Sequence, residues 1–407
     1  MRENRGWVGS GRAMVCLGLG VLMSHGFGLS LLPAMLPNIS RDLGVGYDTL
    51  GLVVASGLVA YAAGAASTAR ILPGRSARGV LMATLIVDAV GLGASATATG
   101  PAGLGVAAAA LGFVAPISWS ATLHLVTETV DPARRGTVMS AASGGAAFGV
   151  LLNGVLVQTS ASVHSWRLSF VLAASLSAIP LLWSRWLFPA EITVQHSRGP
   201  KRGVLSDRWG RILVVAGLAA GVSGFPFNAF LTATAVDELD TGSLAAAALW
   251  WLIGGFGTLA APVFGRLGDR YAPTLGLLVG AVLHGAGLVF LFATWSYLGL
   301  VVAAVGFASM NYPIWGLVGA AAANRFPPET AVRITSLGLL AASLGGATAN
   351  AATGVWIERT GSFRGPVLVM IGVIGAQAVW YAKRLSSDRP DINLAGTPGR
   401  RGHGRSR

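Results

Sequence analysis

The chain has 407 residues, of which 53% are hydrophobic and only 11% are charged, and its mean hydropathy is +0.64. A soluble protein of this length could not bury so much apolar surface, so the composition excludes a soluble enzyme and predicts a protein with several membrane spans. The single cysteine, Cys16, excludes an internal disulfide. The formal net charge of +13 could indicate a nucleic-acid partner, but the placement of the basic residues gives a different explanation below.

Apolar blocks long enough to cross a bilayer follow one another along the whole chain. Six lie before a polar interruption, at 13–36, 48–69, 79–98, 103–129, 137–160 and 167–188. Six follow it, at 210–234, 243–264, 274–293, 296–323, 334–357 and 365–384. The 57 glycines suit helices that pack closely in lipid. We predict an all-α membrane protein with 12 transmembrane helices in two six-helix bundles.

The polar interruption at 189–209 is either an ordinary loop or the junction of a duplicated chain. The two flanks resemble each other at a nearly constant offset of 197 or 198 positions, and Gly26-Phe27 recurs as Gly224-Phe225, 198 positions later. Further matches at this offset pair Pro116-Ile117 with Pro313-Ile314, Gly149 with Gly346, Asn153 with Asn350, and Ser165-Trp166-Arg167 with Ser362-Phe363-Arg364. Matches that keep their order predict an internal duplication.

The duplication divides the chain into five parts. We expect a cytoplasmic N-terminal segment at 1–12, a first bundle at 13–188, a cytoplasmic linker at 189–209 and a second bundle at 210–384. The remaining residues, 385–407, are polar and basic, and we expect a disordered tail there.

The arginines and lysines predict the orientation. Only four of the 29 lie in loops on the side opposite the termini, namely Arg41, Arg167, Arg359 and Arg364. By the positive-inside rule, both termini and the linker are therefore expected in the cytoplasm. This bias explains the basic composition without nucleic acid, and it predicts a multi-pass protein of the cell (plasma or inner) membrane.

A loop after the eighth block carries a family resemblance. Gly265-Arg266-Leu267-Gly268-Asp269-Arg270 resembles the Gly-x-x-x-Asp-Arg signature of the major facilitator superfamily (MFS). Together with the twelve blocks, the duplication and the central loop, the resemblance covers about residues 13–384. It implies the MFS fold, two bundles that rock about a site near the membrane midplane.

The resemblance also implies a cytoplasmic gate. Its expected members are Gly265, Asp269 and Arg270, with Arg134 or Arg135 at the start of the fifth helix as partner of Asp269. In the family this aspartate is thought to hold the halves together when the transporter faces outward. The first half departs from the pattern, because Ala69 stands where Asp269 stands in the second, so one of two such latches is missing.

Two buried ionisable residues are candidates for proton coupling. Asp88 lies nine residues into the third block, at ~1.5 Å per residue close to the centre of a ~30 Å hydrocarbon core. An ionised carboxylate there costs ~2.5 to 3.5 kcal/mol, so Asp88 either exchanges a proton during a cycle or makes a structural polar contact. His25 in the first block is the second candidate, either proton carrier or packing residue. His124 and His284 are weaker candidates.

Neutral polar and aromatic residues near mid-span are candidates for the substrate cavity. Residues 225–228 are expected to break the seventh helix where residues 25–28 loosen the first, and paired breaks point to a transporter site. Asn153 and Asn350 could equally serve as interhelical hydrogen-bonding groups. The candidates are Phe27, Trp119, Asn153, Phe225, Phe227, Asn228, Trp315 and Asn350.

The absence of Lys and Arg from the interior of the spans favours a neutral, lipophilic or cationic solute over an anion. We expect a proton-coupled secondary transporter that acts as a monomer without metal or cofactor. Export is favoured over import, although the fifth helix lacks the Gly-Pro ending typical of antiporters in the family. The alternative is a non-transporting sensor or scaffold on a transporter fold. No clustered catalytic groups or nucleotide-binding loop point to a membrane enzyme or an ATP-driven pump.

Overall fold

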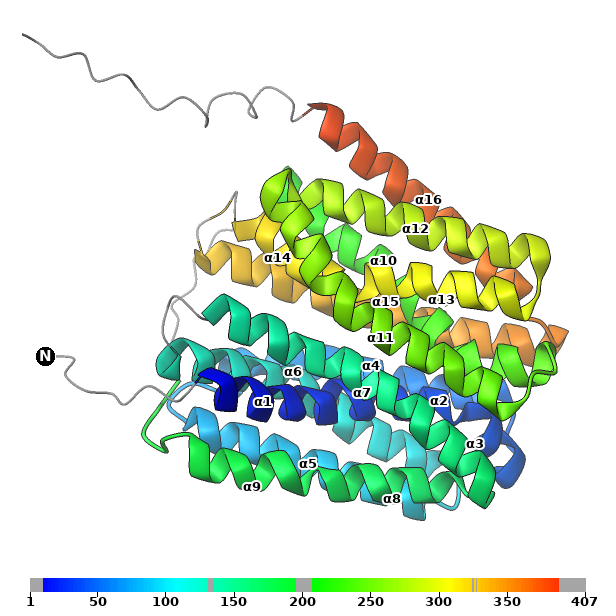
Figure 1. The fold of residues 1–407 in the computed structure, drawn as a ribbon, viewed down its shortest axis with the longest axis horizontal. Coiled ribbons are helices and arrows are strands. Elements are labelled where there is room, and N and C mark those ends of the chain that lie inside the picture. Colours follow the sequence, from blue (N-terminus) through cyan, green and yellow to red (C-terminus); the bar gives the residue numbers. More distant parts are fainter. Residues whose placement is uncertain (1–9, 131–134, 195–206, 324–325, 327, 388–407) are drawn as a thin grey trace, which may run out of the picture.

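The computed structural model describes residues 10–130, 135–194, 207–323, 326 and 328–387. Within these ranges the chain is helical apart from turns and one isolated β-bridge, between Ser76 and Thr193. The helices of the first half lie together below those of the second half in Figure 1. The expectations for the N-terminal nine residues and for most of the basic tail concern residues outside the described ranges.

The first half runs back and forth through long helical segments. Its first segment is bent, because a π-helical turn and the chain around Met35 interrupt it. The elements are α1 (Ser10–Val21), η1 (Leu22–Phe27), α2 (Gly28–Ala34), α3 (Leu36–Leu43), α4 (Tyr47–Ile71), α5 (Ala77–Thr97), α6 (Pro101–Thr129), α7 (Arg135–Val163), α8 (Trp166–Leu176) and α9 (Ala178–Leu187).

The second half also runs back and forth through long helical segments. Its elements are α10 (Arg208–Ala233), η4 (Thr234–Glu238), α11 (Ser243–Arg270), α12 (Pro273–Thr294), α13 (Tyr297–Asn311), α14 (Pro313–Ala323), α15 (Pro328–Thr360) and α16 (Arg364–Ser387).

Eleven helical segments of the described chain are long and apolar enough to cross a membrane. They coincide with eleven of the twelve predicted blocks. The remaining predicted block, 334–357, lies within α15, whose 33 residues are long enough but which does not reach the same apolarity. Its polar residues are tolerated because α15 packs between α4 and α10.

Glycines let pairs of helices approach backbone to backbone. A Cβ on Gly64 or Gly112 would collide with the backbone of Phe113 or Gly57, which brings α4 against α6. Gly217 meets the backbone of Gly338 in the same way where α10 packs on α15. Small residues serve this purpose in lipid because the hydrophobic effect does not drive helices together there.

The two halves meet chiefly along two helix pairs, α4 with α15 and α7 with α11, and α2 and α3 also contact α10. In the second pair, a Cβ on Gly254 would collide with the backbone of Leu151. Figure 1 shows α7 and α11 close together in the middle of the molecule and apart toward the ends nearest the label N. The seam between the halves is therefore the place where a site shared by both could form.

The start of the linker is ordered, which the sequence did not indicate. Val194 exchanges backbone hydrogen bonds with the loop between α4 and α5, donating to Arg75 O (3.0 Å) and accepting from Gly74 N (2.9 Å). Ile192 O accepts from Ala77 N (2.8 Å), and Ile192 and Val194 are both buried. The first residues of the predicted linker are therefore bound to the first half. Residues 195–206 fall outside the described chain.

Candidate functional site

A cavity of about 50 Å³ lies on the seam and is lined from both halves. The first half contributes Gly28 of α2 and Leu58 of α4. The second half contributes Phe225 and Asn228 of α10 and Asn350 of α15. Leu58 lies near the middle of the candidate span 47–68, which places the cavity close to mid-depth. Three of the predicted cavity residues come together here.

Asp88 of α5 lies behind this cavity. Its side chain is 0% exposed, and neither carboxylate oxygen has a hydrogen-bond partner within the described part of the chain. A Cβ built on Gly28 would lie 3.8 Å from Asp88 Oδ1 and 3.8 Å from Leu111 Cβ. Because Gly28 also lines the cavity, the carboxyl group and the cavity meet the same glycine.

The first helix is distorted next to this glycine. The π turn η1 ends at Phe27, and Gly26 within it packs so closely on α7 that its Cβ would lie 2.7 Å from Gly149 Cα. A π turn shifts carbonyl groups out of the regular helical pattern, and Asn153 Nδ2 donates to Gly26 O at 3.2 Å. The interpretation of this stretch as loosened helix is confirmed.

The matching prediction for the seventh helix is wrong. α10 continues through residues 225–228, with Pro226 inside it, and the π turn η4 comes later, at Thr234–Glu238. Proline removes one N–H donor and crowds the carbonyl four residues earlier, but α10 is packed against α15 and α16. Neighbouring helices hold such a segment helical within a membrane.

His25 lies in a group of rings from three helices. Its imidazole centroid is 6.1 Å from Tyr61 of α4 and 6.3 Å from Trp119 of α6, both edge-on. Its Nδ1 is 2.9 Å from Ser24 Oγ. His25 and Trp119, predicted separately, are therefore neighbours, and Tyr61 was missed because an isolated tyrosine gives no sequence signal.

Other predicted aromatic residues lie inside the bundles. Phe227 is 0% exposed and packs with His284 and Phe307, at ring distances of 6.1 and 5.3 Å. Phe27 is 1% exposed, and Trp315 packs against the core of the second half. These three residues do not line the seam cavity, whereas Phe225, which precedes Phe227 by two positions, does.

The two repeated asparagines have different surroundings. Asn153 holds the π turn through Gly26 O. Asn350 is 1% exposed and lines the seam cavity, and both its amide atoms lack a partner among the described residues. An unpaired buried amide is costly unless something else satisfies it. Asn350 can therefore donate to and accept from a molecule that enters the cavity.

The sequence was also compared with known families. The sequence model described as Major Facilitator Superfamily matches residues 18–350. The chain belongs to the major facilitator superfamily.

Solved structures share the MFS fold at low sequence identity. The D-xylose-proton symporter aligns with a TM-score of 0.73 and 14% identity over 91% of this chain and 97% of that one. The nucleoside transporter NupG gives 0.69 and 12% over 92% and 98%. A bacterial homolog of the human lysosomal transporter Spinster, inward-facing and occupied, gives 0.68 and 13% over 92% and 97%. None of the curated proteins matches the chain.

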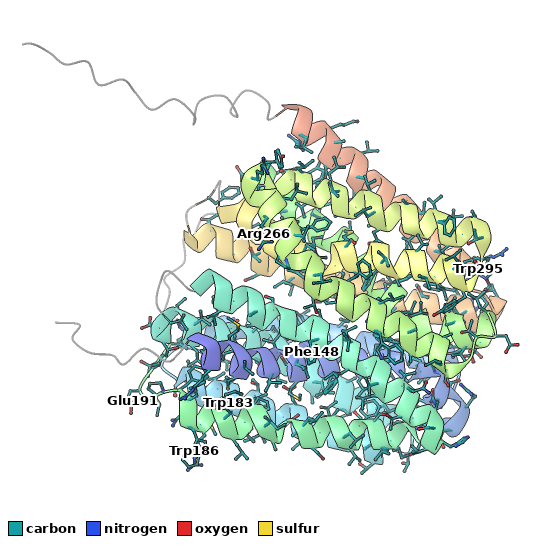
Figure 2. All side chains as sticks on the ribbon, in the orientation of Figure 1. Phe148, Trp183, Trp186, Glu191, Arg266 and Trp295 are labelled. Carbon is teal, nitrogen blue, oxygen red and sulfur yellow. The ribbon has the colours of Figure 1, made fainter. Side chains whose placement is uncertain are left out.

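The expected MFS gate is only partly described. Gly265 and Arg270 lie in the last turns of α11, and the guanidinium of Arg270 lies 5.5 Å from the ring of Tyr271. Arg134 and the side chains of Asp269 and Arg135 lie outside the described residues, so the predicted pairing stays a prediction. Figure 2 shows Arg266 toward the end of the molecule at which α1 begins in Figure 1.

The opposite ends of the two MFS halves are joined directly. Tyr47 at the start of α4 donates its hydroxyl to Asp237 of η4 and its backbone N–H to Glu358 of α15, the latter at 2.8 Å. A Cβ on Gly51 would lie 2.9 Å from Asn350 O. These contacts close the seam on the side away from the termini, and the sequence reading missed them because they join residues about 190 to 310 positions apart.

Proposed function

We propose that this MFS chain is a proton-coupled secondary transporter that moves a small neutral, lipophilic or cationic solute by alternating access, with export as the favoured direction. The observation that carries the proposal is the placement of Asp88. The carboxyl group is buried and unpaired, yet it approaches Gly28, which lines the cavity between the halves.

An unpaired charge at this depth costs several kcal/mol, so a buried Asp88 is stable when it carries a proton. If rocking of the halves admits water at Gly28, the carboxyl group can ionise and release that proton. A residue that gains and loses a proton as its hydration changes couples the proton gradient to the conformational cycle. His25 faces the Tyr61 and Trp119 rings and is a second group able to take part.

The seam contacts support alternating access. Tyr47, Asp237 and Glu358 tie the halves on the side away from the termini, and α7 and α11 separate toward the other side. The basic residues predict that the termini lie in the cytoplasm, so the side on which α7 and α11 are apart would be the cytoplasmic side. Opening the other side requires these bonds to break and the helix ends around Gly265 and Arg270 to close.

The cavity supports a solute without negative charge. Its described lining includes the amides of Asn228 and Asn350 and the ring of Phe225, and it contains no lysine or arginine. The unpaired amide of Asn350 can bind one donor and one acceptor on a neutral group. The rings near His25 offer stacking surfaces, which also suit an aromatic cation.

Proteoliposomes test the proposal. A thermal-shift screen of neutral and cationic aromatic compounds on the purified protein selects a probe, and its flux is then measured with and without a pH gradient. We expect the gradient to accelerate flux through the wild type and Asp88→Glu, and to have no effect on Asp88→Asn. Gradient dependence that persists in Asp88→Asn would refute the role given to Asp88.

The same preparation distinguishes the alternative of a non-transporting sensor or scaffold. Single cysteines are placed at Tyr47 and at Gly265 in a Cys16→Ser background and labelled from each side of the membrane. A transporter exposes the two positions alternately, with the balance shifted by the probe. A scaffold gives one fixed pattern and no flux.

A further inference from the structure

An apolar groove, separate from the seam cavity, opens on the outside of the second half. It has a volume of about 760 Å³ and lies between α10, α15 and α16. Its lining includes Leu218, Pro226, Leu344, Trp356, Pro366 and Leu368.

The groove faces the lipid. Leu344, Leu368 and Val369 on its rim are 46%, 55% and 61% exposed, and Leu368 and Val369 lie within the candidate span 364–385. In a membrane such exposed apolar side chains contact acyl chains. From Leu344 to Trp356 the groove follows α15 for about 18 Å at ~1.5 Å per residue. This matches the ~15 Å of hydrocarbon in one leaflet.

Two arginines lie at the end of the groove near Trp356. Arg359 follows Trp356 by three residues. Arg364 precedes Gly365, which packs so closely on Trp356 that a Cβ there would lie 2.4 Å from the indole ring. Both arginines are exposed, and they are two of the four cations predicted on the side away from the termini. Trp356 itself is 48% exposed, as expected of a tryptophan at a membrane interface.

The repeat shows why Arg364 is available. Its mate in the first half, Arg167, forms a salt bridge with Asp42. Next to Arg364 in the second half, Glu238 accepts hydrogen bonds from Ser362 Oγ (2.6 Å) and Phe363 N (2.9 Å). Glu238 also accepts one from Trp295 Nε1.

The carboxylate of Glu238, the acid beside Arg364, is therefore bonded to neutral donors. The guanidinium of Arg364 lies instead over the Trp295 ring, 4.8 Å from its centroid. Within the described part of the chain, neither Arg359 nor Arg364 forms an ion pair. Two exposed cations that lie within about one helical turn of the lining residues Trp356 and Leu368 along α15 and α16 are complementary to a phosphate group with a hydrocarbon chain attached.

We propose that this groove binds one anionic phospholipid of the leaflet away from the termini, with its phosphate at Arg359 and Arg364 and one acyl chain between α15 and α16. The chain would pass along Leu368 toward Pro226, the proline inside α10. The bound lipid would thereby fill the space between α10 and the outer parts of α15 and α16.

Photocrosslinking in liposomes tests this site. Full-length protein is reconstituted with phosphatidylglycerol or phosphatidylcholine that carries a diazirine on one acyl chain, and labelled peptides are mapped by mass spectrometry. We expect peptides spanning 344–370 to be labelled several-fold more by the phosphatidylglycerol probe. Equal labelling by the two probes in the wild type would overturn the headgroup assignment.

Matched variants separate the two parts of the site. The double variant Arg359→Gln/Arg364→Gln should remove the preference for phosphatidylglycerol, whereas Arg167→Gln in the first half should keep it. Ala352→Trp, which fills the groove, should reduce labelling by both probes. Val106→Trp adds the same side chain at a lipid-facing position of α6 that is 73% exposed, and should leave labelling unchanged.

Native mass spectrometry of the same samples tests the other possible occupant. The proposal requires a monomer that retains one phospholipid in the wild type and loses it in Ala352→Trp. A dimer that dissociates in Ala352→Trp would mean that a second copy of the chain covers this face, and the lipid site would be wrong. This outcome does not depend on whether Asp88 couples transport to protons.

Discussion

The two halves use the same repeat positions for different purposes. In the first half Gly26 and Gly149 bring the backbones of the first segment and α7 into contact. At the corresponding place in the second half, the ring of Phe225 lies where a Cβ on Gly346 would go. One half is joined there by backbone packing and the other by an aromatic side chain, which leaves the second half more room to rearrange.

The peripheral third helix of each half shows the same divergence. Asp88 on α5 and His284 on α12 lie at nearly equivalent positions, and both are buried with an unpaired side-chain atom in the described chain. Asp88 approaches the seam through Gly28, whereas Phe227 and Phe307 cover His284. Access to the cavity, and not burial alone, therefore distinguishes a candidate coupling group from a packing residue.

The largest expected difference between the halves concerns these two residues. Asp88→Asn should abolish the stimulation of flux by a pH gradient, whereas His284→Gln should keep it, because Phe227 and Phe307 separate His284 from the seam. Flux of the screened probe in proteoliposomes, with the gradient on and off, measures both. Equal losses in the two variants would mean that the halves share the coupling role.

The next largest expected difference between the halves is in the stability lost when alanine replaces glycine at these contacts. Gly149→Ala places a methyl group against the backbone of Gly26, and overpacking of this kind costs ~1–3 kcal/mol. Gly346→Ala meets the movable ring of Phe225 and should cost less. Thermal unfolding in detergent, followed by tryptophan fluorescence, compares them. A larger loss for Gly346→Ala would contradict the view that the second half is more adaptable there.

A smaller difference in stability is expected between alanine variants of the two repeated asparagines. Asn153→Ala removes the hydrogen bond to Gly26 O and should destabilise the protein by ~0.5–1.5 kcal/mol. Asn350→Ala removes no such bond within the described chain, so its stability should change little, while its apparent affinity for the screened probe should fall. Unfolding and binding are measured on the same preparations. A stability loss in Asn350→Ala with unchanged binding would remove Asn350 from the proposed site.

The smallest effect concerns the exposed pair Asp42 and Arg167. The hydrogen bond from Arg167, followed by that from Trp166, lowers the pKa of Asp42. A lowered folded-state pKa means that the pair contributes stability above the unfolded value of ~3.9, and that this contribution is lost as pH falls through the lowered pKa. Asp42→Asn should therefore lower Tm slightly at pH 7, and its difference in Tm from the wild type should shrink as pH falls through the lowered pKa.

The second half supplies the control for that experiment. Arg364→Gln should leave the pH dependence of Tm unchanged, because Arg364 lies over Trp295 and forms no ion pair within the described residues. Equal pH dependence in Asp42→Asn and wild type would show that the salt bridge contributes nothing measurable, as many exposed pairs do not.

The sequence by itself determined the membrane class, the helical segments and the repeat. Spanning length and apolarity are local properties, so eleven predicted blocks recur as candidate spans. The remaining predicted block, 334–357, is also helical within α15, although it falls short of the apolarity of the other spans, and its polar residues are tolerated because α15 packs between α4 and α10. The predicted break at 225–228 failed for a related reason, because packing of α10 overrides the local effect of Pro226.

Only the tertiary structure decided which residues share an environment. Spacing along the chain could place Asp88 at mid-depth, but the approach of Gly28 depends on how η1 and the first residue of α2 pack against α5. Phe225 and Phe227 look equivalent in sequence, yet a helix turns by about 200° over two residues. That rotation puts one residue in the cavity and the other in the core.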